Sequence, residues 1–98
     1  MLNKKQILEL MHDKQKEIER YGVKKIGLFG SYLKSRHKRD SDIDILVEFR
    51  RGEKTFDNYM DLKFFLEDLF NNDVDLVIKE NVRLELKKGI LKSVRYAT

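Results

Sequence analysis

The sequence predicts a small α/β (α+β) domain in which a three- to four-stranded mixed sheet is flanked by helices. Residues 42–49 alternate apolar and polar side chains as a half-buried strand does, and the apolar-rich stretch 23–29 is a second predicted strand. A third short apolar stretch, 73–78, follows a predicted helix over 56–70, which is long enough for a parallel crossover. Turn residues separate these stretches, so the predicted element order is α-β-β-α-β-α.

The first predicted helix covers residues 3–21. Asn3 can cap its N-terminus, and Gly22 is a natural stop at its C-terminus. Its apolar residues recur at roughly helical spacing, and they are Ile7, Leu8, Leu10, Met11, Ile18 and Tyr21.

The two long strands are predicted to be joined by a polar, basic segment, 32–41, that follows Gly30-Ser31. In the first strand, Ile26 and Leu28 share one face. In the second strand one face carries Ile43, Ile45, Val47 and Phe49, and the opposite face carries Asp42, Asp44, Leu46 and Glu48.

The helix over 56–70 has Thr55 or Asp57 as its candidate cap. Its predicted apolar face consists of Phe56, Tyr59, Met60, Leu62, Phe65, Leu66 and Leu69. Phe64 and Phe70 lie off this stripe, so we expect one of them on an exposed patch. Asn71-Asn72 ends the helix. A last helix, over roughly 82–94 and capped by Asn81, would present Val82, Leu86, Ile90 and Val94.

Composition excludes several classes of protein. The chain has 98 residues, enough for one domain, and no cysteine, so it has neither disulfides nor thiolate metal sites. No stretch approaches the 18 or so apolar residues of a membrane span, and no signal peptide is recognisable, so we expect a cytoplasmic protein. The net charge of +4 permits acidic partners, but it is too small to predict direct nucleic-acid binding.

Two aspartates, Asp42 and Asp44, point to the same face of the second strand. Strand residues rise about 3.3 Å each, so these two backbones lie about 6–7 Å apart and their carboxylates can converge. Carboxylates on one face repel each other unless a cation neutralises them. Mg²⁺, which takes oxygen ligands from carboxylates and phosphates, suits this arrangement. Solvated acids at an ordinary strand edge are the alternative.

A third carboxylate, that of Asp75, would join them if the last strand pairs in the right register. Three aspartates on one sheet face suit two-metal phosphoryl transfer. Asp73 faces the same way, but it belongs to the cluster Asn71-Asn72-Asp73, which is typical of a turn.

Gly30-Ser31 is a candidate phosphate-binding turn. Glycine lets the backbone approach a ligand closely, and Ser31 offers a hydroxyl and an N–H group at what would be the start of a short helix. A plain strand-ending turn is the alternative. The segment that follows carries the positive charges of Lys34, Arg36, Lys38 and Arg39, which either attract a triphosphate or form a solvated surface loop.

These residues together form the pattern G-S-x10-D-x-D, from Gly30-Ser31 to Asp42-Ile43-Asp44. Ile45-Leu46-Val47-Glu48-Phe49 follows it directly and Val74-Asp75-Leu76-Val77 follows after a helix. In this pattern the sequence resembles the nucleotidyltransferase superfamily that shares a core with DNA polymerase β, and more closely its minimal members. The resemblance covers nearly the whole chain and implies one minimal nucleotidyltransferase domain, residues 1–98.

The resemblance implies the following roles. Gly30, Ser31, Lys34 and Arg36 would contact the nucleotide, and Asp42, Asp44 and Asp75 would be the catalytic residues and would ligate two Mg²⁺ ions. Asp75 would also help to activate the acceptor hydroxyl. The reaction would transfer AMP from ATP to that hydroxyl and release pyrophosphate.

The resemblance also implies a partner. Minimal nucleotidyltransferases are commonly encoded beside a HEPN-domain ribonuclease toxin and act as its antitoxin by adding AMP to a tyrosine. A HEPN toxin is therefore the expected acceptor, and a complex with it or an oligomer of this chain is the expected assembly.

One departure from the family pattern keeps two alternatives open. Relatives often continue Gly-Ser with a small residue, an arginine and a glycine, whereas this chain has Tyr32-Leu33-Lys34-Ser35. Lysine lacks the planar fork with which arginine holds phosphate. A non-catalytic antitoxin that blocks its partner by occlusion is one alternative, and nucleotidyl transfer to a small molecule is the other.

Overall fold

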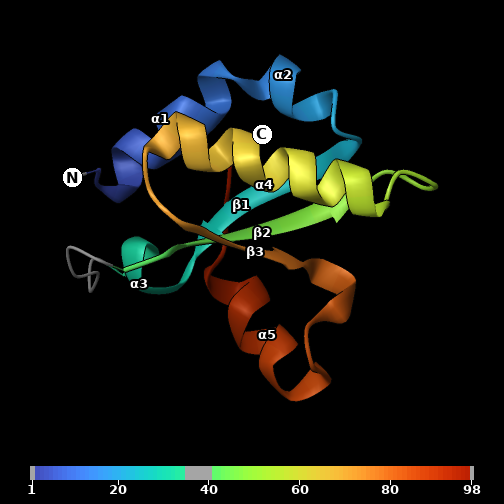
Figure 1. The fold of residues 1–98 in the computed structure, drawn as a ribbon. Helices are drawn as coiled ribbons and strands as arrows, with labels where there is room; N and C mark the ends of the chain where they lie inside the picture. Colours follow the sequence, from blue (N-terminus) through green and yellow to red (C-terminus); the bar gives the residue numbers. More distant parts are fainter. Residues whose placement is uncertain (1, 35–40, 98) are drawn as a thin grey trace.

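The computed structural model, which describes residues 2–34 and 41–97, is a mixed sheet with helices on both faces (Figure 1). The sheet has four strands in the order β3-β2-β1-β4. β1 pairs antiparallel with β2 and β4, whereas β2 and β3 are parallel. The predicted fold class and the parallel crossover are therefore confirmed. The strands are β1 Val23–Phe29, β2 Ile43–Phe49, β3 Val74–Ile78 and β4 Arg95–Tyr96.

The N-terminal segment forms two helices, α1 (Lys4–Asp13) and α2 (Gln15–Glu19), so the prediction of one helix over 3–21 is wrong. Asn3 caps α1 as predicted, in a capping box with Gln6. The break falls at Lys14, within a polar stretch that has no apolar side chain to hold a continuous helix against the sheet.

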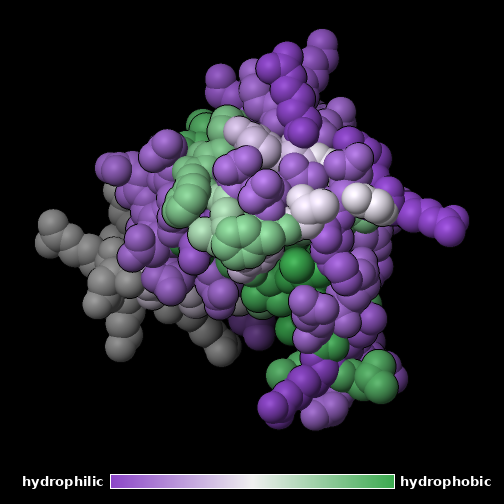
Figure 2. Space-filling view, turned by 45° about the vertical axis from the view of Figure 1, so that its right-hand side comes forward, coloured by the Kyte–Doolittle hydropathy of each residue, from purple (hydrophilic) through white to green (hydrophobic). Residues whose placement is uncertain are grey.

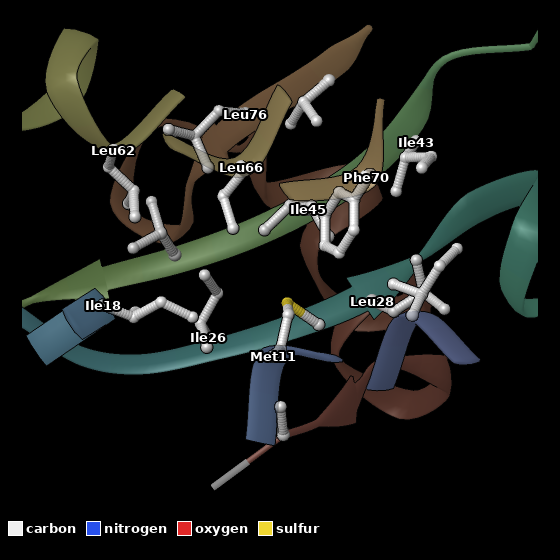
Figure 3. Packing of buried hydrophobic residues seen from close by; sticks show 14 of the residues in the cluster. Met11, Ile18, Ile26, Leu28, Ile43, Ile45, Leu62, Leu66, Phe70 and Leu76 are labelled. Atoms are coloured by element: carbon white, nitrogen blue, oxygen red, sulfur yellow. The ribbon is translucent and has the colours of Figure 1, made fainter. Parts of the chain in front are cut away.

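The hydrophobic core lies between one face of the sheet and the helices α1, α2 and α4 (Figures 1 and 3). The predicted alternation of β2 is confirmed, because Ile43, Ile45 and Val47 are fully buried on the core face. Met11 and Ile18 from the N-terminal helices and Leu62, Leu66 and Phe70 from α4 pack around these residues (Figure 3).

Helix α4 spans Phe56–Phe70, as predicted, and Thr55 caps it by accepting a hydrogen bond from the N–H of Asn58. Phe70 is buried and Phe64 is exposed, which confirms that one of the two lies at the surface. The placement of Phe56 on the buried stripe is wrong: its side chain is 77% exposed, because the first turn of α4 extends beyond the core.

The C-terminal segment differs most from the prediction. Asn81 ends a short 3₁₀ helix, η1 (Lys79–Asn81), and does not cap the last helix, α5, which spans Leu84–Ser93. α5 lies on the sheet face opposite α4 (Figure 1). It has no buried residue, and Leu86, expected in its apolar stripe, is exposed. Among the described residues, no helix is long and apolar enough to cross a membrane.

Side chains of α4 cover the outer edge of β3. The C=O of Asp73 accepts from the N–H of Ile43 in β2, so Val74 and Leu76 direct their own backbone groups away from β2. A carboxylate oxygen of Glu67 accepts from the N–H of Val74 at 3.1 Å. The hydroxyl of Tyr59 donates to the C=O of Leu76 at 2.6 Å.

Candidate active site

Strand pairing brings the predicted site segments together at one end of the sheet. Phe29, the last residue of β1, pairs with Asp44 of β2, and Asp44 pairs with Asp75 of β3. Gly30 and Ser31 follow Phe29 directly and begin a short helix, α3 (Gly30–Leu33), at the same end as the start of β2 (Figure 1). The register that would bring Asp75 beside Asp44, left open by the sequence, is the one that the sheet adopts.

Gly30 is required by its close contact with Asp44. Its φ is +75°, and a Cβ atom at this position would lie 2.1 Å from the Oδ2 atom of Asp44. Any other residue would therefore be strained and would displace the carboxylate. The backbone N–H of Ser31, expected at a phosphate, points to the Asp44 carboxylate closely enough to favour its charged form and lower its pKa. The Gly-Ser turn thus positions one of the predicted metal ligands.

The Asp44 carboxyl lies in surroundings that disfavour its charge. Burial is the main cause that raises its pKa, the charges of Asp75 and Asp42 add to it, and only the Ser31 N–H opposes the shift. The Asp75 carboxyl lies beside that of Asp44, and their side-chain contact also raises the pKa of Asp44. Among the described residues, no lysine or arginine forms an ion pair with either.

This pair fits a hard divalent cation. Two adjacent carboxylates supply the oxygen ligands that Mg²⁺ prefers, and a cation would neutralise their charge and remove the repulsion. As the side chains stand, no three Asp, Glu, His or Cys groups of residues 2–34 and 41–97 converge on one metal position. The geometry thus supports Asp44 and Asp75 as the centre of the site, with Asp42 beside them.

Asp42 and Asp73 both lie just outside the ladder, because β2 begins at Ile43 and β3 at Val74, one residue later than predicted. Asp42 is exposed, but it is close enough to raise the pKa of both Asp44 and Tyr32. Asp73 lies in the turn before β3, as the sequence predicted, and Asp75 is the one that pairs with Asp44.

The basic segment contributes less to the described structure. Lys34 is exposed directly after α3, and Arg36, Lys38 and Arg39 lie outside the described residues. Tyr32, which the sequence analysis assigned to a polar loop, is instead 1% exposed and anchors α3 in the core. Burial and then the charge of Asp42 raise the pKa of its hydroxyl. The signal that could have revealed the buried position of Tyr32 was an aromatic residue beside Gly-Ser in an otherwise polar segment.

Comparisons with known proteins agree with this geometry. Residues 4–97 match the family described as "Nucleotidyltransferase domain". Protein adenylyltransferase MntA of Thermococcus cleftensis is 38% identical over 97 residues, which cover 98% of this chain and 97% of the relative.

Two solved structures share the fold. A structure described as a minimal nucleotidyltransferase has a TM-score of 0.75 at 28% identity, with 90% of this chain and 93% of that chain covered. A toxin–antitoxin structure with AMP-PNP has a TM-score of 0.69 at 26% identity, with 89% of this chain and 72% of that chain covered.

The fold and the paired carboxylates beside a Gly-Ser turn define a nucleotidyl-transferring enzyme. This chain belongs to the nucleotidyltransferase domain family, and its architecture is that of the minimal members.

Proposed function

We propose that the protein is a Mg²⁺-dependent adenylyltransferase that moves AMP from ATP to a hydroxyl, that of a tyrosine, on a HEPN toxin and so acts as its antitoxin. The observation that carries the proposal is the register that sets Gly30, Asp44 and Asp75 side by side. The names of the similar proteins, a protein adenylyltransferase and a toxin–antitoxin pair with AMP-PNP, support the donor and the partner. Because the donor is ATP, we place the reaction in the cytoplasm.

In the proposed reaction the acceptor oxygen attacks the α-phosphorus of ATP, a new P–O bond forms, and the bond to pyrophosphate breaks. Asp75, exposed at the site, accepts the proton of the acceptor hydroxyl. Gly30 makes room for the Asp44 carboxylate and Ser31 offers its hydroxyl to the triphosphate, while Asp42 and Asp44 would hold the cation with Asp75. Bound Mg²⁺ supplies neutralisation of the charge that develops on the phosphoryl and leaving oxygens.

An apolar surface offers a place for a protein acceptor. Phe56, Leu84 and Leu86 are 77%, 82% and 57% exposed, far more than a leucine or phenylalanine in a core. Figure 2 shows hydrophobic atoms gathered in the middle and lower part of one face. Phe56 also lines a groove of about 450 Å³, together with Tyr59, Val77 and Ile78 among others. Val77 is two residues from Asp75 along β3, so a protein bound here would lie next to the carboxylates.

The same surface favours a second candidate function, inhibition of the partner by occlusion alone. The two functions differ in what the carboxylates do, because a pure binding module has no need for Asp44 and Asp75 in contact.

The test is intact-protein mass spectrometry of a HEPN toxin after incubation with this protein, ATP and Mg²⁺. We expect a mass increase by whole AMP units, and none with the double variant Asp42→Asn/Asp44→Asn. A stable complex without any mass increase would favour occlusion. An unchanged increase with the double variant would show that the metal assignment is wrong.

A further inference from the structure

The turn between α4 and β3 carries an amide group that the site described above does not use. Asn71 ends α4 in the left-handed conformation, with a φ of 49°. Asn72 follows it, and its side chain is partly buried. From the sequence, both residues were expected only to end the helix and form a turn.

The side-chain amide of Asn72 bonds the backbones that precede both site strands. Its Nδ2 donates to the C=O of Ser41 at 3.1 Å and to the C=O of Asp73 at 2.9 Å. Both partners are acceptors, so only the nitrogen of the amide can serve them. Ser41 directly precedes Asp42, and Asp73 lies two residues before Asp75. One side chain therefore links the segment of Asp42 to the segment of Asp75.

This link lies where the sheet itself provides little restraint. The β2–β3 ladder begins at the bond from the N–H of Ile43 to the C=O of Asp73, 3.0 Å long, so Asp42 is outside it. The C=O of Ser41 directly precedes Asp42, and it is held in place by a side chain, because it accepts a hydrogen bond from the amide of Asn72. Tyr32 of α3 adds a longer contact to the same carbonyl, with its hydroxyl at 3.5 Å.

Asn72 is itself held by α4. Its backbone N–H donates to the C=O of Glu67 at 3.3 Å, and the Glu67 carboxylate in turn accepts from the N–H of Val74 at 3.1 Å. The amide thus projects from a turn that is fixed on both sides, as a positioning group must be.

We propose that Asn72 is a positioning residue of the carboxylate site: its amide fixes the start of β2 against the start of β3 and thereby sets the spacing of Asp42 and Asp75 on which divalent-cation binding depends. The inference rests on the proposed function, since it assigns the cation to these carboxylates. Groups that orient metal ligands without touching the metal typically change affinity by about 10- to 100-fold when they are removed.

The test compares Asn72→Ala with Asn71→Gly, a matched control in the same turn that keeps the left-handed backbone and leaves the amide of Asn72 intact. Mn²⁺ binding is titrated by electron paramagnetic resonance in the presence of a non-hydrolysable ATP analogue, and thermal unfolding reports on the fold. We expect about tenfold weaker Mn²⁺ binding for Asn72→Ala and unchanged binding for Asn71→Gly. The Mg²⁺ concentration for half-maximal transfer should rise in parallel, with most of the rate recovered at saturating Mg²⁺.

If Asn72→Ala does not fold, Asn72→Ser replaces it, because its hydroxyl can keep one of the two bonds; we expect a smaller loss of Mn²⁺ affinity. Unchanged Mn²⁺ affinity in a folded Asn72 variant overturns the inference and leaves the proposed function standing. No binding of Mn²⁺ by the unsubstituted protein overturns both.

Discussion

Two acids on the same face of β2 lie in opposite electrostatic surroundings. Glu48, at one end, accepts a hydrogen bond from Lys79 at 3.2 Å and lies 3.8 Å from the ammonium of Lys24. Burial alone would raise the pKa of Glu48, but Lys79 and then the lysines 24 and 25 outweigh it and lower the pKa. Asp44, about 13 Å away along the strand, has another carboxyl as its neighbour and a raised pKa.

The charge of the neighbouring side chains therefore distinguishes a structural acid from a functional one better than the residue type does. Glu48 has local cations that neutralise it, so the fold needs nothing more there. Asp44 and Asp75 have no such cation among the described residues, and a folded protein keeps two unneutralised acids together only at some cost. An acid with a raised pKa beside a second carboxyl is typical of sites that bind a cation or transfer a proton.

The largest expected effect is the loss of transfer on neutralising Asp44. Asp44→Asn removes a proposed cation ligand without changing shape, and we expect transfer to fall by about 1,000-fold or more. Glu48→Gln, the matched change at the other end of the strand, should leave activity nearly unchanged. The rate of labelled AMP incorporation measures the effect of both substitutions. Equal losses of activity would contradict the proposed functional difference between Asp44 and Glu48.

A smaller effect should distinguish Asp75 from Asp73. Asp75→Asn removes the proposed proton acceptor, and we expect a loss of about 100-fold at a Mg²⁺ concentration that saturates the variant. Asp73→Asn alters only a turn residue and should keep nearly full activity. If Asp73→Asn reduced the rate as much as Asp75→Asn, the third carboxylate would have been assigned to the wrong residue.

Without metal, the same substitutions should change stability in opposite directions. Asp44→Asn relieves the repulsion from Asp75 while its side-chain oxygen can still accept from Ser31, so we expect it to stabilise the fold by about 1 kcal/mol. Glu48→Gln weakens the pairing with Lys79, and we expect it to destabilise the fold by about 1 kcal/mol. Urea unfolding with EDTA at neutral pH measures both; a destabilising Asp44→Asn would contradict the assignment.

The pH dependence of these differences should also be opposite. The folded-state pKa of Glu48 is below its ordinary value of 4.5, so its contribution to stability is present above about that pH and is lost as the pH falls through the folded pKa. The folded-state pKa of Asp44 is raised, so stability is lost as the pH rises through the window between its ordinary and folded values. Unfolding of both variants against the unsubstituted protein, from pH 3 to pH 7, tests the two signs.

The smallest effect concerns the two lysines that neutralise Glu48. The Lys79 side chain is 28% exposed and bonds Glu48 directly, whereas that of Lys24 is 61% exposed and farther away. Lys24→Ala should therefore change the free energy of unfolding by less than about 0.5 kcal/mol, and Lys79→Ala by more. A salt titration of the unfolding free energy provides the check, since the more exposed pair should be screened first.

The strands and helix caps were predicted well because the sequence signals for them lie within a few positions of each element. Alternation in β2 and the capping residues Asn3 and Thr55 act within a few positions, and each was found where expected. The register that pairs Asp44 with Asp75 was not predictable, because it depends on how α4 returns the chain to β2. The role of Asn72 arises from a contact 31 positions away, for which its own neighbours give no signal, whereas the burial of Tyr32 was signalled only by its aromatic side chain in a polar segment.

The C-terminal prediction failed for a related reason. The sequence places Val82, Leu86, Ile90 and Val94 in helical register, but α5 has no buried residue, and Leu84 and Leu86 lie at the surface. An apolar stripe indicates that one face of a helix packs against other apolar residues. It does not show whether those residues belong to the same chain or to a partner.

The hydrogen bonds that Glu67 and Tyr59 make along the outer side of β3 also affect how copies of this protein meet. An edge strand with open N–H and C=O groups is a template for fibrillar stacking, and short apolar strands such as Val74–Ile78 are prone to it. Because side chains of α4 already engage the N–H of Val74 and the C=O of Leu76, these two groups are not open to a strand of another copy. We therefore expect β3 to recruit further strands less readily than a bare edge strand would.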